Sequence, residues 1–376
     1  MIPYGKQSID EEDINSVIEA LKSGWLTGGP LVEKFEKEFA NYTGAKYAVA
    51  VSNGTAALHL SCLVSGLKKN EEIITSPMTF AASANCALYC RAKPIFADIK
   101  EENGLLDEEL IEEKITESTE VIIPVHYTGN VCEMEKIKKI ADKYNLTIIE
   151  DACHALGSEY NNTKIGDCTY SDMAVFSFHP VKNITTGEGG MITTNSREKY
   201  EKLIKLRNHG ITKNKEEMQN NDPWYCEMQY LGFNYRLSDI QCALGISQLK
   251  KLDNFIEKRR EIAQKYDDSF KSIESIKPLK TKQNVKNAYH LYVVKTKSKE
   301  ERSELFDLLK KNEIICQVHY IPVYWHPYYQ NKGYEQGICP KAENFYDQII
   351  SLPVYPAMAN SDQEKIIQTI NKLYEK

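Results

Sequence analysis

Short apolar runs alternate with polar, helix-like stretches between about residue 45 and residue 195. The runs are rich in Val, Ile and Phe, which is typical of strands buried on both faces. They predict strands at residues 47–51, 72–75, 94–97, 121–125, 146–149, 174–178 and 191–194. The stretches between them predict helices at residues 55–67, 80–89, 107–116 and 133–144. This alternation indicates an α/β domain with a mostly parallel seven-stranded sheet.

The pattern changes after Arg236. A helical stretch begins at residue 237 and continues to about residue 270. The remaining units are smaller, with extended segments at residues 288–296 and 314–320 and helices at residues 299–311 and 362–374. We therefore expect a large domain over residues 1–250 and a smaller C-terminal α+β domain over residues 251–376. The long polar segment 211–230 is interpreted as a mobile loop or a functional cover.

Composition narrows the function classes. The chain has 376 residues and a formal net charge of −6, so it lacks the overall basic charge that favours nucleic acid. No apolar run approaches the length of a membrane span, and the first residues lack the apolar core of a signal peptide. The ten cysteines contain no CxxC pair, which indicates reduced thiols, and no metal site is expected. We expect a cytoplasmic protein with no nucleic-acid or membrane partner.

Two predicted strands end in side chains that can do chemistry. Asp151 closely follows one strand, and Lys182 follows another. Ligands of parallel sheets bind at the carboxyl ends of the strands. Taken singly, an acid at this position is usually a helix cap and a lysine is usually solvated. The glycine-rich segment 187–190 lets the backbone approach a ligand closely. The turn 52–55 opens a helix, and a helix start with small residues can bind phosphate.

A cofactor explains this combination better than side chains alone. Pyridoxal 5′-phosphate needs a lysine for its Schiff base and an acid that keeps its pyridine nitrogen protonated. It also needs phosphate donors, which a helix N-terminus with small residues supplies. We therefore interpret Lys182, Asp151 and the turn 52–55 as parts of one cofactor site.

The chain resembles the DegT/DnrJ/EryC1 family of sugar aminotransferases, which have the type I fold of pyridoxal-phosphate enzymes. The matching segments occur in the expected order over nearly the whole chain, at residues 26–30, 52–58, 77–85, 150–157, 177–182, 187–190, 207–210 and 231–237. Within the family, residues 177–186, 243–251 and 317–324 are similar to the transaminases of pseudaminic acid synthesis. The resemblance implies transfer of an amino group from L-glutamate, which leaves as 2-oxoglutarate, to the C4 keto group of a UDP-linked 4-keto-6-deoxy-N-acetylhexosamine. A C4 or C3 transaminase for another dTDP- or UDP-linked keto-sugar is the alternative.

The resemblance also implies roles for individual residues. Lys182 is expected to bind the cofactor covalently and carry protons, and Asp151 to pair with the pyridine nitrogen. The other expected cofactor contacts are His154 at the ring hydroxyl, Phe80 on the ring face, and Gly54, Thr55, Ser177 and Asn234 at the phosphate. Asn234 is expected to come from a neighbouring subunit, so the active site would form only in a homodimer.

The substrate contacts are implied by the same resemblance. They are Tyr4, Gly24, Trp25, Leu26 and Thr27 near the N-terminus, Gln317, Val318, His319 and Tyr320 in the smaller domain, and Gly54, Ser177 and Asn234, which also contact the cofactor. His59 and His290 lie outside these motifs and are interpreted as structural residues.

Two other function classes are less compatible with the sequence. A related sugar dehydratase would carry histidine in place of the lysine, and Lys182 is present. A non-catalytic relative that only senses sugar nucleotides would be expected to lose Lys182 or Asp151. This chain has both residues.

Overall fold

The computed structural model describes residues 1–220 and 222–374, and its largest sheet has seven strands. In spatial order they are β1 (Tyr47–Val51), β9 (Gly190–Thr194), β8 (Met173–Ser177), β5 (Thr147–Asp151), β4 (Thr119–Ile123), β2 (Glu72–Thr75) and β3 (Lys93–Phe96). Within it, β9 runs antiparallel to both neighbours, and the pairs from β8 to β3 are parallel. The predicted mostly parallel seven-stranded sheet is confirmed.

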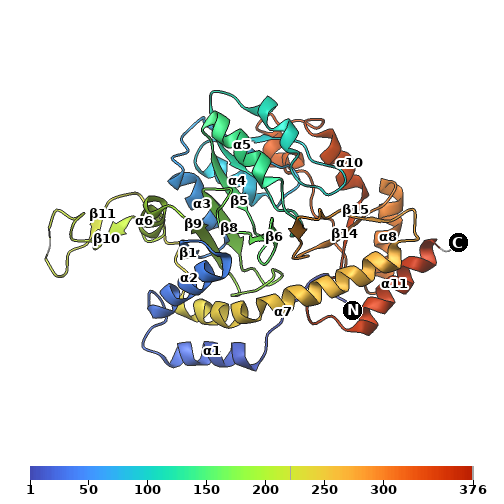
Figure 1. Ribbon diagram of the computed structural model, residues 1–376, viewed down its shortest axis with the longest axis horizontal. Helices are drawn as coiled ribbons and strands as arrows, with labels where there is room; N and C mark the ends of the chain where they lie inside the picture. Colours follow the sequence, from blue (N-terminus) through green and yellow to red (C-terminus); the bar gives the residue numbers. More distant parts are fainter. Residues whose placement is uncertain (221, 375–376) are drawn as a thin grey trace.

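Helices cover both faces of this sheet (Figure 1). Side chains alternate between the faces along each strand, so Val49 and Val51 join one apolar cluster while Ala48 and Ala50 join the other. The first face is covered by α3 (Gly54–Val64), α4 (Ala82–Tyr89) and α6 (Arg197–Leu206). The second face is covered by α2 (Pro30–Thr43), α5 (Met134–Tyr144) and the first half of α7 (Asp239–Phe270).

The 32-residue helix α7 connects the two parts of the molecule. A capping box formed by Ser238 and Gln241 starts it, which satisfies backbone N–H groups that a helix leaves free at this end. Its first half packs against α2 and α1 (Glu11–Lys22). Its last turns, including Tyr266 and Phe270, join the core of the C-terminal part. Figure 1 shows α7 running beneath both parts.

The C-terminal part is built around a three-stranded antiparallel sheet. Its strands are β12 (Lys277–Pro278), β14 (Tyr292–Lys295) and β15 (Ile349–Leu352). Its helices are α8 (Lys299–Lys311), η3 (Val323–Trp325), α9 (Pro327–Gln330), α10 (Pro340–Gln348) and α11 (Asn360–Tyr374). The N-terminus also lies here, because Ile2 N–H donates to Glu313 O at 2.8 Å and Ile2 O accepts from Ile315 N–H at 2.8 Å. The domain boundary near residue 250 stays a prediction.

Two predicted elements are wrong. Residues 107–116 form two single 3₁₀ turns, η1 (Glu108–Leu110) and η2 (Glu112–Lys114), in place of a helix. Glu108 is buried there and pairs with Lys100 and Lys136, and such tertiary contacts override helix propensity. Residues 314–320 form only isolated bridges, to Ile2 and to Ser351. The third strand of the small sheet is β15, whose continuous apolar run was not recognised.

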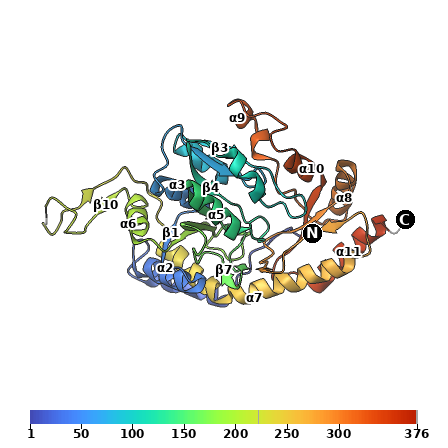
Figure 2. The ribbon, with the colours of Figure 1, turned by 45° about the horizontal axis from the view of Figure 1, so that its top comes forward.

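The segment predicted to be a loop or cover forms a projecting hairpin. Its strands are β10 (Ile211–Thr212) and β11 (Glu227–Met228), and both ribbon views show it extending away from the body of the molecule (Figures 1 and 2). A further small sheet, formed by β13 (Val285–Lys286), β6 (Glu159–Tyr160) and β7 (Thr163–Lys164), ties the two parts together. No helix in residues 1–220 or 222–374 is long and apolar enough to cross a membrane.

Candidate active site

A cavity of about 860 Å³ lies at the carboxyl ends of the central strands, where the C-terminal part meets the large sheet. Most of the residues predicted to bind the cofactor or substrate line it. They are Tyr4, Gly54, Thr55, Phe80, Asp151, His154, Ser177, Lys182, His319 and Tyr320. Residues far apart in the sequence therefore meet in one place, as the rule for parallel sheets predicts.

Lys182 and Asp151 reach the cavity from neighbouring strands. Asp151 is the last residue of β5, and Lys182 lies in the loop after β8, the neighbouring strand. Burial lowers the pKa of the Lys182 amine from its ordinary value, and the neighbouring carboxylate of Asp151 partly opposes this shift. A lysine with a lowered pKa spends more of its time as the neutral amine, which is the form that acts as a base.

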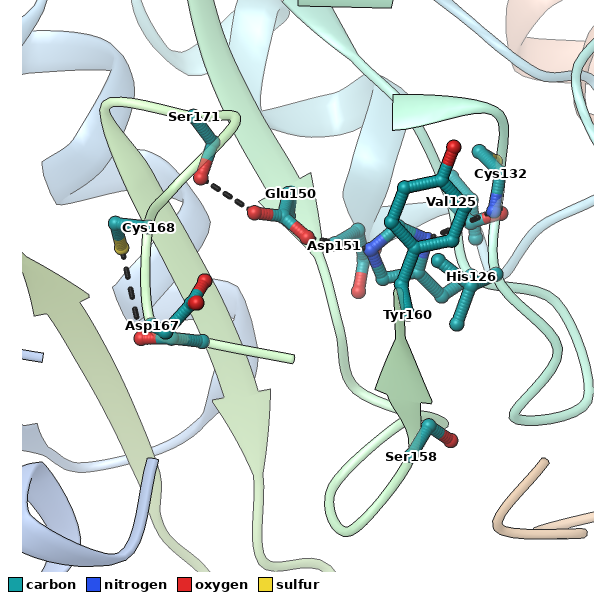
Figure 3. Close-up of polar contacts among 12 residues, drawn as sticks. Val125, His126, Cys132, Glu150, Asp151, Ser158, Tyr160, Asp167, Cys168 and Ser171 are labelled. Carbon is teal, nitrogen blue, oxygen red and sulfur yellow. Dashed lines mark hydrogen bonds and ion pairs between the residues drawn. The ribbon is translucent and has the colours of Figure 1, made fainter. Parts of the chain in front are cut away.

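The carboxylate of Asp151 is held through both oxygens. Ser83 Oγ–H donates to Oδ2 at 2.5 Å, and the backbone N–H of Cys153 donates to Oδ1 at 3.1 Å. Because side chains alternate along a strand, the preceding residue, Glu150, points to the opposite side of β5. Figure 3 shows Glu150 between His126 and Ser171. His126 Nε2 lies 2.7 Å from Glu150 Oε2, and Ser171 donates to the other oxygen.

The start of α3 offers a phosphate site. Asn53 caps this helix, and its side chain accepts from Ala56 N–H at 2.8 Å. The helix itself does not use the N–H groups of Gly54 and Thr55, because the first N–H groups of a helix have no intrahelical acceptor. A Cβ at position 54 would lie 3.0 Å from Ser177 Cβ, so glycine keeps the helix start close to the Ser177 hydroxyl. Backbone donors at a helix N-terminus attract anions.

His154 is tied to both parts of the molecule. Its Nδ1 accepts from Thr128 N–H at 3.3 Å, so the neutral ring carries its proton on Nε2, which faces Tyr320 OH at 3.0 Å. Burial, reinforced by the charge of Lys182, holds the pKa of His154 well below its ordinary value. Both ring nitrogens therefore already have partners in this structure, and the predicted contact of His154 with the ring hydroxyl stays a prediction.

Two more of the histidines that line this cavity also have lowered pKa values. Burial, with a contribution from Lys182, lowers the pKa of His319 to about 4 and that of His290 well below its ordinary value. His290 lies with its ring centroid 4.4 Å from that of His154, and His319 Nδ1 is 2.8 Å from Ser351 Oγ. Three of the rings that line the cavity with Lys182, those of His154, His290 and His319, therefore favour the neutral form.

Several predicted residues lie outside this cavity. The segment 24–27 runs along the start of α7, where Thr27 bridges Ser238, and its Trp25 and Leu26 side chains are exposed. Gln317 pairs with Ser351 through its backbone, and Val318 packs against the main core. Asn234 bridges Asn208. Of the twelve predicted substrate contacts, the cavity includes Tyr4, Gly54, Ser177, His319 and Tyr320, and it does not include Gly24, Trp25, Leu26, Thr27, Asn234, Gln317 or Val318.

The cavity also contains residues that the sequence interpretation missed. They include His59, Thr79, Ser83, Tyr89, Val125, Cys153, Glu188, Tyr235 and His290. For Thr79 and Ser83 a signal was available, because both lie in the segment 77–85 that resembles the family. His59 and His290 had been interpreted as structural, and nothing in their local sequence distinguishes a cavity residue from a core residue.

The donor set fits pyridoxal phosphate. One cavity presents an amine for a Schiff base, a carboxylate held on both oxygens, an aromatic ring at Phe80 and a helix N-terminus beside a serine hydroxyl. No group of three or more metal-ligating side chains with the geometry of a metal site occurs in the described ranges. The cavity is also larger than the cofactor alone requires, which leaves room for a substrate.

Comparisons with known proteins extend this result. Residues 7–371 match the DegT/DnrJ/EryC1/StrS aminotransferase family. The chain is 41% identical over 381 residues to the UDP-4-amino-4,6-dideoxy-N-acetyl-beta-L-altrosamine transaminase of Campylobacter jejuni, covering 100% of this chain and 98% of that protein.

Two solved structures have the same fold over the full length. The Streptococcus pneumoniae protein Spr1654, solved in its PLP form, has a TM-score of 0.93 at 31% identity, covering 100% of this chain and 98% of that one. Helicobacter pylori PseC, an aminotransferase involved in the biosynthesis of pseudaminic acid, has a TM-score of 0.92 at 35% identity, covering 100% and 99%.

Proposed function

Because the chain belongs to the DegT/DnrJ/EryC1/StrS aminotransferase family, we propose that it moves the amino group of L-glutamate to the C4 keto group of a UDP-linked 4-keto-6-deoxy-N-acetylhexosamine. The family resemblance inferred from the sequence is confirmed, and so are its consequences that the chain is an aminotransferase and that its cofactor is pyridoxal phosphate. The proposal concerns the donor, the sugar and the residues that act on them.

The observation that carries the proposal is the juxtaposition of Lys182 and Asp151 in one cavity. When bound, the cofactor supplies an electron sink that stabilises negative charge on the carbon next to the transferred amine. We assign the pyridine nitrogen to Asp151, the ring face to Phe80, and the phosphate to Gly54, Thr55 and Ser177.

Proton transfer is assigned to Lys182. Its Nζ removes the proton from the carbon that bears the amino group of glutamate. The amino group is retained in the site, and water supplies the keto oxygen of the 2-oxoglutarate that is released. In the second half of the reaction, Nζ returns a proton to C4 of the sugar. Burial favours this role, because it lowers the pKa of the amine and so increases the share of the neutral form that acts as a base. The neutral rings of His154, His290 and His319 place no further positive charge beside Nζ.

The sugar is proposed from two features. The C. jejuni relative is named for a UDP-linked altrosamine and matches this chain over its whole length. Tyr4, His319 and Tyr320 also line the cavity on the side of the C-terminal part, where a sugar above the cofactor would lie. A C4 or C3 transaminase for another dTDP- or UDP-linked keto-sugar is the second candidate, because transaminases of this kind share the cofactor site.

The proposed assembly is a homodimer. Asn234 and the segment 24–27 lie outside the cavity of their own chain, which is compatible with contributions to a neighbouring site. The projecting hairpin and the residues that follow it expose the large apolar side chains of Trp224, Met228 and Leu231, and exposed apolar groups of this size often mark protein contacts. A cytoplasmic location is also proposed, and it is compatible with ten free cysteine thiols.

The test of the chemistry uses Lys182→Arg. We expect this variant to fold but to lose transamination by at least about a thousandfold. The arginine that replaces Lys182 stays protonated and cannot act as the base. Lys139→Arg, which changes an exposed lysine on α5, is the matched control. Absorbance bleaching on addition of glutamate, in the absence of any sugar, measures the first half of the reaction. Normal bleaching in Lys182→Arg would disprove the assignment.

The test of the sugar is a substrate comparison. Purified protein and glutamate are incubated separately with UDP- and dTDP-linked 4-keto-6-deoxy sugars, with and without the N-acetyl group, and each product is identified by NMR. A 4-amino product from the UDP-linked N-acetyl sugar alone supports the proposal. A faster reaction with a dTDP-linked sugar, or an amine at C3, favours the second candidate.

A further inference from the structure

A buried chain of hydroxyl groups leads from the start of α4 to Asp151. Thr79 Oγ1 lies 2.7 Å from Ser83 Oγ, and Ser83 Oγ lies 2.5 Å from Asp151 Oδ2. Thr79 is only 3% exposed and Ser83 only 1% exposed, so water does not compete freely for these hydrogen bonds. Both residues also line the cavity.

The direction of the protons in this chain follows from chemistry. An ionised carboxylate only accepts hydrogen bonds, and each hydroxyl carries one proton. Ser83 must therefore donate to Asp151, and its oxygen is left to accept the proton of Thr79. The carbonyl of Phe80 is the other acceptor near Ser83 Oγ, but it is 3.3 Å away and competes poorly with a charged acceptor at 2.5 Å.

These hydroxyl groups help to fix the orientation of the Asp151 carboxylate, because Asp151 accepts hydrogen bonds from protein donors on both oxygens. With the N–H of Cys153 on Oδ1 and Ser83 on Oδ2, rotation of the carboxylate is restricted. The segment that carries Thr79 and Ser83 also carries Phe80, which lines the same cavity. One turn of chain therefore places both the ring-facing aromatic side chain and the hydroxyl group that holds the carboxylate.

We propose that Ser83, held in place by Thr79, is a positioning residue that aims the Asp151 carboxylate at the cofactor and keeps the shared proton on the ring nitrogen. This inference rests on the proposed pairing of Asp151 with that nitrogen. A hydrogen bond donated to a carboxylate stabilises its ionised form. With Ser83 donating, the proton between the two groups stays on the nitrogen. Without Ser83, the proton moves toward the carboxylate and the ring becomes a weaker electron sink.

The experiment measures that proton directly. The holoenzyme is prepared with pyridoxal phosphate labelled with ¹⁵N in the ring, and the ¹⁵N chemical shift reports how far the nitrogen is protonated. In Ser83→Ala we expect the ratio of protonated to unprotonated nitrogen to fall by about tenfold, because one hydrogen bond to a charged group is lost. Thr79→Val leaves Ser83 without its donor and should move the shift in the same direction by a smaller amount.

A matched control removes a buried hydroxyl elsewhere. Thr75 lies on β2, and its Oγ1 donates to Ile123 O at 2.8 Å and not to the Asp151 carboxylate. Thr75→Val should leave the ring resonance in place, because a general loosening of the fold does not change the protonation of the cofactor. Melting curves of all variants establish that they are folded. If Ser83→Ala does not fold, Thr79→Val decides the test.

Asp151→Asn separates the two proposals. If Asp151→Asn moves the ring resonance while Ser83→Ala and Thr79→Val leave it unchanged, the role of Ser83 is overturned and the role of Asp151 stands. If Asp151→Asn also leaves it unchanged, Asp151 does not pair with the nitrogen, and both assignments are overturned. Movement in Ser83→Ala and Asp151→Asn, with an unmoved Thr75→Val, supports the inference.

Discussion

At the scale of single residues, the neutral histidines around Lys182 make the stability of the protein depend on pH. Burial lowers the pKa of His319 to about 4, and it holds those of His154 and His290 well below their ordinary value. In the unfolded chain each of these rings has an ordinary pKa near 6.5. Between about pH 6.5 and pH 4 the unfolded chain therefore binds more protons than the folded one, and the free energy of unfolding falls as the pH falls.

The residue-scale prediction concerns His319. His319→Gln removes one of these rings, so the slope of the unfolding free energy against pH should decrease by up to about 1.4 kcal/mol per pH unit in this window. Urea denaturation of the cofactor-free protein at several pH values and one protein concentration measures the slope. His326→Gln, which changes a histidine outside the cavity, serves as the control. An unchanged slope in His319→Gln would contradict the neutral state of this ring.

At the scale of elements, the two contacts of Glu150 drawn in Figure 3 connect segments at three neighbouring strands. Glu150 on β5 pairs with His126, which follows β4, and with Ser171, which precedes β8. His126 and Glu150 are both buried. Removing one partner of a buried pair leaves the other charge or dipole without compensation, which is far more costly than losing an exposed pair.

The element-scale prediction follows from this burial. His126→Leu should lower the free energy of unfolding by about 3 kcal/mol, and His126→Gln by less, because the amide can still donate to Glu150. Lys139→Met removes an exposed pair with Glu135 on α5 and should change the free energy by less than about 0.5 kcal/mol. Urea denaturation measures all three. Equal effects of His126→Leu and Lys139→Met would show that the buried pair adds nothing to stability.

At the scale of the whole molecule, the projecting hairpin bears on the proposed homodimer. Trp224 is 80% exposed and Leu231 is 83% exposed, and the hairpin contacts little of its own body (Figure 2). Apolar side chains in such a position gain free energy by burial in an interface. Asn234 follows the hairpin directly, so the contact that would bury Leu231 would also bring Asn234 near a neighbouring site.

The whole-molecule prediction is that Leu231→Glu weakens the dimer. We expect light scattering after gel filtration to show a dimer for the unchanged protein and a dissociation constant at least about a hundredfold higher for Leu231→Glu, because a charge replaces a buried apolar group. Transamination should fall with the dimer population. Tyr328→Ser changes an exposed aromatic residue on α9 and should change neither. A monomeric unchanged protein would contradict the proposed assembly.

The sequence by itself determined the class of fold and the chemistry of the site. Strand runs such as 47–51 and 72–75 were predicted at their observed bounds, because a strand buried on both faces leaves a continuous apolar signature. Asp151 and Lys182 were placed at one sheet edge because strand ends in a parallel sheet converge. The motifs then identified the family.

Only the tertiary structure decided the features that depend on contacts between residues far apart in the sequence. Buried ion pairs at Glu108 replaced a predicted helix with 3₁₀ turns, and the chain of donors from Thr79 through Ser83 to Asp151 joins residues about seventy positions apart. His290 reached the cavity only through the packing of the C-terminal part. Local patterns record how a segment buries its own side chains, whereas hydrogen-bond partners and cavity walls are fixed by which segments meet when the whole chain folds.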